Sequence, residues 1–153
     1  IGWCVSIVEI HTAGGSHGNP GPGGWAFVMQ YEDSYAERFG AERHTTNNRM
    51  ELMAVISALE TVRDQRVDHS PIRVTTDSQY VKNGISTWIH TWLKNGWKTA
   101  AKKPVKNQDL WIRLHELAST LTVEWAWVRG HAGNIQNERC DELVQRAIAG
   151  VEE

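Results

Sequence analysis

Hydrophobic and polar residues follow two different periods along this 153-residue chain. β-branched residues dominate the run from Val5 to Thr12, which predicts a first strand. Residues 25–31 and 35–43 predict a second strand and a third, more polar strand, with a turn signal at 32–34. Because short connections favour antiparallel neighbours, we expect these three strands to form a meander.

The period then changes to that of an amphipathic helix. Thr45–Asn48 offers capping side chains for a helix that starts near Arg49, and its buried stripe is expected at positions 52, 55, 56, 59 and 62. Residues 72–77 predict a fourth strand that ends on Asp77. Val123, Trp125 and Trp127 alternate with Thr122, Glu124 and Ala126, which predicts a fifth strand over residues 122–127.

Four more helical segments are expected. The first runs from Ser78 to Val81 and is ended by Gly84, and the second covers residues 86–93, with Trp88 and Trp92 in the core. The third covers 108–120, and the last begins at Asn137. This order predicts an α/β fold: a mixed five-stranded sheet, three strands antiparallel and then parallel ones, with helices on both faces.

Length and composition are those of one globular domain over residues 1–153. No apolar run approaches ~20 residues and no secretory signal is visible, so we expect no membrane association. Cys4 and Cys140 leave a disulfide open on sequence alone, but free thiols in a reducing cytosol are favoured. We therefore expect a cytoplasmic monomer.

The stretch from Ala13 to Gly24 contains six glycines and two prolines. Since glycine permits unusual φ angles and proline removes a backbone donor, we predict a long loop here rather than helix or regular sheet. A loop at the carboxyl end of a central strand is where α/β proteins tend to build their sites.

Charge is strongly segregated, although the formal net charge is only −2. Between Ser78 and Gln108 there is no Asp or Glu, and the basic residues there are Lys82, Lys94, Lys98, Lys102, Lys103 and Lys106. We predict a basic protrusion at about 86–107 that binds nucleic acid. Its lysines would neutralise phosphates, and Trp97 would pack against sugars or bases. The alternative is a merely solvated basic face.

Three carboxylates stand where the predicted backbone could bring them together. Glu51 lies near a helix start, Asp77 at a strand end and Asp141 in the last helix. Oxygen ligands of this kind suit Mg²⁺. The alternative is one helix-terminal Glu and two surface acids, and spacing alone does not decide between the two. His131, in a Gly-flanked loop, is a candidate for proton transfer or is simply solvated.

Side-chain amides surround these acids. They belong to Asn19, Asn47, Asn48 and Gln79. Amides donate to and accept from ribose hydroxyls, the group that distinguishes RNA from DNA. For Asn19 and Asn47, capping and turn roles explain the residues equally well.

Several motifs, in this order, closely resemble type 1 ribonuclease H of the bacterial kind. They are Thr45–Leu52, Thr76–Val81, Gly96–Lys98, Pro104–Asn107, Trp127–Gly133 and Asn137–Glu142. The resemblance extends from about Val8 to Ala149 and includes the basic protrusion. It implies a ribonuclease H-like fold and an endonuclease that cuts the RNA strand of an RNA–DNA hybrid, leaving 5′-phosphate and 3′-hydroxyl ends.

The resemblance also implies a mechanism with two Mg²⁺ ions about 4 Å apart, for which Mn²⁺ can substitute. Glu51, Asp77 and Asp141 match three of the four family metal ligands, and His131 matches the catalytic histidine. Asn19, Asn47, Asn48 and Gln79 match residues that touch the hybrid. Thr46 matches a residue of a phosphate pocket. The arm that grips the DNA strand is matched by Trp88, Lys94, Trp97, Lys98, Lys102, Lys103 and Lys106.

One position departs from the family pattern. The first strand of the family ends Thr-Asp-Gly, whereas this chain reads Thr12-Ala13-Gly14, so Ala13 replaces the aspartate that bridges both metals. Glu9 lies about 13 Å back at ~3.3 Å per residue and cannot substitute. We expect the chain to fold and bind hybrid but cleave very poorly, with less repulsion among the remaining carboxylates.

Two explanations for Ala13 stay open. Deliberate inactivation of an active enzyme is favoured, because the other ligand positions are intact. The alternative is a natural, non-catalytic hybrid-binding module. An integrase- or transposase-like nuclease is a weaker reading, since such proteins lack the Lys/Trp arm.

Overall fold

The computed structural model describes residues 6–65, 70–129 and 133–152. Five strands form one sheet: β1 (Val8–Ser16), β2 (Gly21–Tyr31), β3 (Ser34–Thr45), β4 (Ile72–Thr76) and β5 (Val123–Trp127). The helices are α1 (Asn47–Gln65), α2 (Gln79–Asn83), the π-helical segment η1 (Gly84–Trp88), α3 (Ile89–Lys94), α4 (Gln108–Thr120) and α5 (Ile135–Glu152).

The strand order in the sheet is β3-β2-β1-β4-β5. β2 pairs antiparallel with both β1 and β3, whereas β4 runs parallel to β1 and β5. The predicted mixed sheet of three antiparallel strands followed by parallel ones is therefore confirmed. In the pairing of β1 with β4, Thr12 lies opposite Thr76. The next residues along the two strands, Ala13 and Asp77, therefore lie side by side at the carboxyl end of β4.

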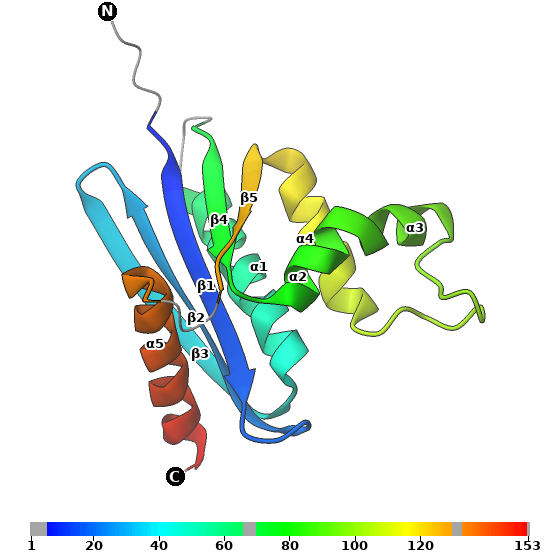
Figure 1. The fold of residues 1–153 in the computed structure, drawn as a ribbon, viewed down its shortest axis with the longest axis horizontal. Helices are drawn as coiled ribbons and strands as arrows, with labels where there is room; N and C mark the ends of the chain where they lie inside the picture. The colour runs from blue at the N-terminus through cyan, green and yellow to red at the C-terminus, as the bar shows by residue number, and fades with distance from the viewer. Residues whose placement is uncertain (1–5, 66–69, 130–132, 153) are drawn as a thin grey trace, which may run out of the picture.

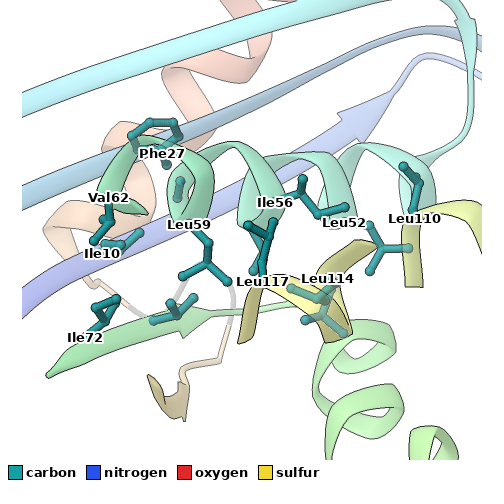
Figure 2. Close-up of a cluster of buried hydrophobic side chains, with 14 of the residues drawn as sticks. Ile10, Phe27, Leu52, Ile56, Leu59, Val62, Ile72, Leu110, Leu114 and Leu117 are labelled. Atoms are coloured by element: carbon teal, nitrogen blue, oxygen red, sulfur yellow. The ribbon is translucent and has the colours of Figure 1, made fainter. Parts of the chain in front are cut away.

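Helices cover both faces of the sheet, with α1 and α4 on one face and α5 on the other (Figure 1). Figure 2 shows the larger core, in which side chains of α1 and α4 meet Ile10, Phe27 and Ile72 from the strands. The five positions predicted for the buried stripe of α1 are all buried. Burying one such Leu or Ile side chain contributes about 1.5–3 kcal/mol. None of the helices in the described residues has the length and apolar character to cross a membrane.

The Gly-rich stretch is not the long loop that we predicted. β1 continues to Ser16 and β2 begins at Gly21, so only residues 17–20 remain between the strands. The glycines belong to the sheet because neighbouring groups come too close for a side chain. A Cβ on Gly14 would overlap the backbone of Glu51, and a Cβ on Gly23 would lie 2.5 Å from the Thr45 side chain.

Gly84 does not end a helix, contrary to our prediction. Ser78 caps α2 as expected, since its Oγ accepts from the Val81 N–H at 3.2 Å, but the chain continues through η1 into α3. Gly84 has ordinary helical angles, φ −62° and ψ −48°. A Cβ at this position would overlap the Trp111 ring, so the glycine makes room for the ring rather than breaking the helix.

A pair of helical glycines tests this reading. Gly84→Ala should lower the free energy of unfolding by about 1–3 kcal/mol, because the Trp111 ring must move. A Cβ on Gly150 in α5 would meet nothing within 4 Å, so Gly150→Ala should be neutral or stabilise by up to about 1 kcal/mol. Urea unfolding of both variants measures the difference, and equal effects would contradict the packing argument.

Candidate active site and nucleic-acid interface

The structure brings three predicted carboxylates together at the edge of the sheet where β1 and β4 end. Asp77 directly follows β4, Glu51 lies in the second turn of α1, and Asp141 lies in α5. Asp77 and Asp141 lie near enough to Glu51 for their charges to raise the pKa of its carboxyl. The residues come from three elements on both faces of the sheet.

Glu51 sits in an environment that opposes its charge. The pKa of this carboxyl lies well above its usual value, chiefly because burial removes it from water and then because Asp77 and Asp141 repel it. A hydrogen bond from the Gly14 N–H acts in the opposite direction. Glu51 Oε2 is buried and accepts no hydrogen bond from the described residues. Among the described residues, no positive charge acts on this carboxylate strongly enough to offset its burial.

Ala13 follows Thr12 in β1, beside the residue after β4, and supplies only a methyl group. It is 1% exposed and packs in the apolar cluster beneath α5, with Ala26, Val28 and Cys140 among its members. Within 6–65, 70–129 and 133–152, no three His, Cys, Asp or Glu side chains form a group that could hold a metal ion. The three carboxylates are thus neighbours without forming a complete ligand set.

Two contacts hold α5, and with it Asp141, over the sheet. Cys140 is a buried free thiol whose Sγ donates to the His11 carbonyl at 3.3 Å, and burial raises its pKa to about 12. Arg139 donates to both carboxylate oxygens of Glu37 on β3, at 2.6 and 2.9 Å. The hydrogen bond from Arg139, followed by that from Tyr35, lowers the pKa of Glu37 to about 2.

The predicted catalytic His131 lies outside the described residues. The chain after it enters α5 through Asn134, whose Oδ1 accepts from the Asn137 N–H at 2.8 Å. We predicted a helix that begins at Asn137, but this cap sits earlier and α5 begins at Ile135. The correction follows from Asn134, an N-cap residue type that the sequence already contained.

The predicted amide residues lie near the N-termini of α1 and α2. Asn19 belongs to the turn after β1, exposed Asn47 and half-buried Asn48 open α1, and exposed Gln79 opens α2. Oδ1 of Asn19 and of Asn47 accepts hydrogen bonds from backbone N–H groups at 2.9 and 2.7 Å. Both residues therefore have the capping and turn role that the sequence left open, and this role does not prevent their Nδ2 groups from binding a ligand.

Thr46 caps α1. Its Oγ1 accepts from the Arg49 N–H at 3.3 Å, and its carbonyl accepts from the Met50 N–H at 3.1 Å. Because this cap satisfies the first free donors of the helix, α1 begins at Asn47 and not near Arg49 as predicted.

The basic arm projects away from the sheet beyond α3 (Figure 1). It closes on itself through a β-bridge between Lys98 and Pro104, and the Thr99 N–H donates to the Lys103 carbonyl at 2.7 Å. Its five lysines are all exposed: Lys94, Lys98, Lys102, Lys103 and Lys106. The sixth lysine of the acid-free window, Lys82, lies 4.5 Å from the ring centre of Trp127.

The tryptophans are placed differently from our expectation. Trp88, predicted to be core, is 36% exposed and rests on Tyr80 and Trp92 with ring centres 5.7 and 5.9 Å away. Trp97, which we expected to face the ligand, is half-buried between Trp92 and His115. Helical spacing shows which residues share a face, but it does not show whether another element covers that face.

Sequence reasoning missed a polar network that joins the arm to α1. Tyr80 OH accepts from Asn107 Nδ2 at 3.1 Å and from Trp111 Nε1 at 2.9 Å, while Arg49 donates to Asn107 Oδ1 at 3.2 Å. Arg49 also pairs with Asp109 through two hydrogen bonds. The partners are distant in sequence, so no local pattern could have revealed them.

Comparison with known proteins agrees with this geometry. The family model described as RNase H matches residues 6–149. The chain belongs to the ribonuclease H family. A Ribonuclease H from Aromatoleum aromaticum is 56% identical over 144 residues, which cover 94% of this chain and 92% of that protein. A Ribonuclease H from Rhodopseudomonas palustris is 57% identical over 142 residues, which cover 92% and 88%.

Solved ribonuclease H structures share the fold. LC9-RNase H1, a type 1 RNase H with the type 2 active-site motif, has a TM-score of 0.82 and 32% identity, covering 98% of this chain and 75% of that one. LC11-RNase H1, solved in complex with an RNA/DNA hybrid, has a TM-score of 0.71 and 25% identity, covering 95% and 99%. The resemblance drawn from the motifs is therefore confirmed for family and fold.

The environment of Glu51 predicts a pH-dependent gain in stability. In metal-free buffer at pH 7, Glu51→Gln should raise the free energy of unfolding by about 1–3 kcal/mol, because the amide keeps an acceptor for Gly14 N–H and loses the buried charge. Since the folded-state pKa of Glu51 is raised, the gain should vanish below its usual value of 4.5 and grow as pH rises above it.

Thermal unfolding between pH 4 and pH 8 measures this gain. The matched control is Glu116→Gln on the exposed face of α4, which should change stability by less than about 0.5 kcal/mol at any pH. A destabilising effect of Glu51→Gln at neutral pH would contradict our account of the buried carboxylate.

Proposed function

We propose that this chain is a ribonuclease H that binds RNA–DNA hybrids and whose cleavage of the RNA strand is nearly abolished by Ala13. The proposal rests on one observation. Glu51, Asp77 and Asp141 gather around the end of β1, where the family resemblance calls for a fourth carboxylate and the chain has a buried methyl group. One domain over residues 1–153 carries this function, with the basic protrusion at about 86–107.

The three carboxylates are of the oxygen-donor type that divalent cations prefer, although the side chains of the described residues do not now form a group that could hold one. Glu51 has a buried oxygen that no described donor satisfies, and its negatively charged neighbours favour a cation over a neutral group. We assign Glu51, Asp77 and Asp141 as ligands of a site for two Mg²⁺ ions, for which Mn²⁺ can substitute. When bound, these ions supply activation of water and neutralisation of the phosphate charge.

The remaining roles belong to side chains of the chain itself. The three carboxylates are carried by three different elements: Glu51 by α1, Asp77 by the residue after β4, and Asp141 by α5. His131 moves a proton near the cleaved phosphate. Ala13 occupies the position of the metal-bridging aspartate and contributes no ligand.

Two surfaces bind the hybrid in this proposal. Asn19, Asn47, Asn48 and Gln79 contact the hybrid near the cleaved bond, and Thr46 lies in a phosphate pocket. The arm binds the DNA strand through Trp88, Lys94, Trp97, Lys98, Lys102, Lys103 and Lys106. The hybrid found with LC11-RNase H1 supports this partner. The buried free thiol of Cys140 is consistent with a cytoplasmic monomer.

A natural hybrid-binding module is the second candidate. The methyl group of Ala13 packs in the apolar cluster beneath α5, as expected of a residue with a structural and not a catalytic role. Deliberate inactivation is favoured, because every other carboxylate of the site is retained.

Reversion of Ala13 separates the candidates. The Ala13→Asp variant should gain cleavage of a labelled RNA–DNA hybrid in Mg²⁺ by at least about 10³-fold, because it restores a missing metal ligand. Hybrid affinity, measured in EDTA, should be similar for both proteins.

The other outcomes are informative. If Ala13→Asp stays inert while both proteins bind hybrid, the chain is a binding module. If neither protein binds a hybrid more tightly than duplex DNA, the proposed function is wrong.

The arm predicts a specific salt dependence. Changing Lys98, Lys102, Lys103 and Lys106 to alanine should weaken hybrid binding at low salt and reduce the slope of log K against log [salt] by up to about 0.9 per lost phosphate contact. Arg38→Ala, an exposed change on β3, should leave the slope unchanged. An unaltered slope in the lysine variant would show that the arm does not contact phosphates.

A further inference from the structure

A cluster of hydrogen bonds joins the end of β1, the following turn and the first residue of α1. The Ser16 N–H donates to Asn47 Oδ1 at 2.7 Å, and the Asn47 N–H donates to Asn19 Oδ1 at 2.9 Å. Ser16 Oγ lies 2.8 Å from Asn19 Oδ1, 2.9 Å from Asn47 Oδ1 and 2.6 Å from the Gly18 carbonyl. Its single proton can be donated to one of these oxygens at a time.

This cluster fixes which way both amides point. A backbone N–H can only donate, so the atom facing it must be the carbonyl oxygen of each side chain, and a flipped amide would set donor against donor. The Ser16 hydroxyl can support this orientation at one of the two amide oxygens at a time, in competition with the Gly18 carbonyl. The Nδ2 groups of Asn19 and Asn47 are left on exposed residues, and neither donates to another described residue.

The turn that carries Asn19 is anchored from a second side. His17 Nδ1 lies 2.6 Å from Glu152 Oε1, and His17 Nε2 lies 3.0 Å from Gln145 Oε1, both on α5. The His17 N–H also donates to the Pro22 carbonyl at 2.7 Å, which closes the hairpin. Contacts to α1 and α5 together hold the turn, so the two amides are presented from a supported surface.

The two fixed Nδ2 donors favour a ligand surface that offers hydrogen-bond acceptors. In a minor groove every base pair offers acceptors, purine N3 and pyrimidine O2, and the ribose 2′-oxygen is another acceptor. Guanine alone adds a donor there, its 2-amino group. A donor facing that group leaves both unsatisfied, which is unfavourable when water is excluded.

We propose that Ser16 is a positioning residue whose hydroxyl adds to the backbone N–H donors of Ser16 and Asn47 in holding Asn19 and Asn47 as a donor-only pair. This pair accepts any base pair of the hybrid but disfavours a guanine 2-amino group. The inference rests on the proposed binding of hybrids and adds a preference against guanine in the contacted base pairs. Tolerance of different sequences and this preference have the same origin, because both follow from a surface that presents only hydrogen-bond donors.

Paired base analogues test the bias on the chain as it stands, with binding measured in EDTA. Replacing guanine by inosine removes the 2-amino group, and replacing adenine by 2,6-diaminopurine adds it, so the same group changes in opposite directions. We expect inosine to tighten binding by about 3- to 10-fold and diaminopurine to weaken it by a similar factor. Equal affinities across the four hybrids would overturn the proposal.

Ser16 variants test the positioning role. Ser16→Ala should weaken hybrid binding and shrink the ratio between inosine and guanine hybrids, and Ser16→Thr should restore both, because it returns a hydroxyl. Ser119→Ala is the control, since Ser119 Oγ likewise donates to a nearby carbonyl, that of Glu116 at 2.9 Å, but lies on α4. An unchanged ratio in Ser16→Ala would overturn the role of the hydroxyl.

The outcomes keep the inference separate from the proposed function. Failure of every hybrid to bind overturns the proposed function and with it this inference. Binding of all hybrids without regard to the 2-amino group overturns the inference alone. Circular dichroism confirms that each Ser16 variant is folded, and the base-analogue series on the unaltered chain does not depend on any variant.

Discussion

The close approach of β1 to α1 is the constraint on which the site depends. Gly14 has no side chain, and any Cβ there would overlap the backbone of Glu51, so the second turn of α1 rests directly on the strand. This contact buries the Glu51 carboxylate beside the ends of β1 and β4, within reach of the charges on Asp77 and Asp141. Packing thus forces like charges together in a place where water cannot stabilise them.

This arrangement explains why we expect Ala13 to have effects in two directions. A fourth carboxylate would add to the repulsion around Glu51, so its absence favours the folded state without metal. The same absence removes an anion that would favour a cation. Stability and metal affinity are therefore expected to change in opposite senses at this one position, which is a common conflict in catalytic sites.

The binding surfaces are held by the same elements as the carboxylates. The Arg49–Asn107–Tyr80–Trp111 network joins the first turn of α1 to the base of the arm. Ser16 joins the same turn of α1 to the turn after β1. A change in the first turns of α1 would therefore reach Glu51, the amides of Asn19 and Asn47, and the base of the arm together, since all of them contact or belong to α1.

Local patterns predicted the elements whose character is set by near neighbours. The helix at 108–120 has the bounds that we expected, and the fifth strand, predicted over 122–127, begins one residue later at Val123, because the apolar period of both segments is regular. The glycines at 14 and 84 misled us, since each is required by a residue far away in sequence, Glu51 and Trp111. Propensity describes what glycine permits, but it does not show which neighbour needs the space.

The site was predictable to a similar extent. Glu51, Asp77 and Asp141 could be proposed from motifs, and the structure brings them together. Ser16 could not, because its importance comes from where two amide oxygens lie and not from its residue type. Trp88 was expected to be buried, yet it is 36% exposed, because helical spacing alone does not show what packs against a side chain.

Thermal stability as a function of Mg²⁺ concentration tests the central claim most directly, because a ligand that binds only the folded state raises stability by RT ln(1 + [L]/Kd). Without metal, the Ala13→Asp variant should unfold at a lower temperature than the unaltered chain. Millimolar Mg²⁺ should raise the unfolding temperature of the variant clearly and that of the unaltered chain much less. An equal response of both proteins to Mg²⁺ would contradict the claim that Ala13 occupies the position of a lost metal ligand.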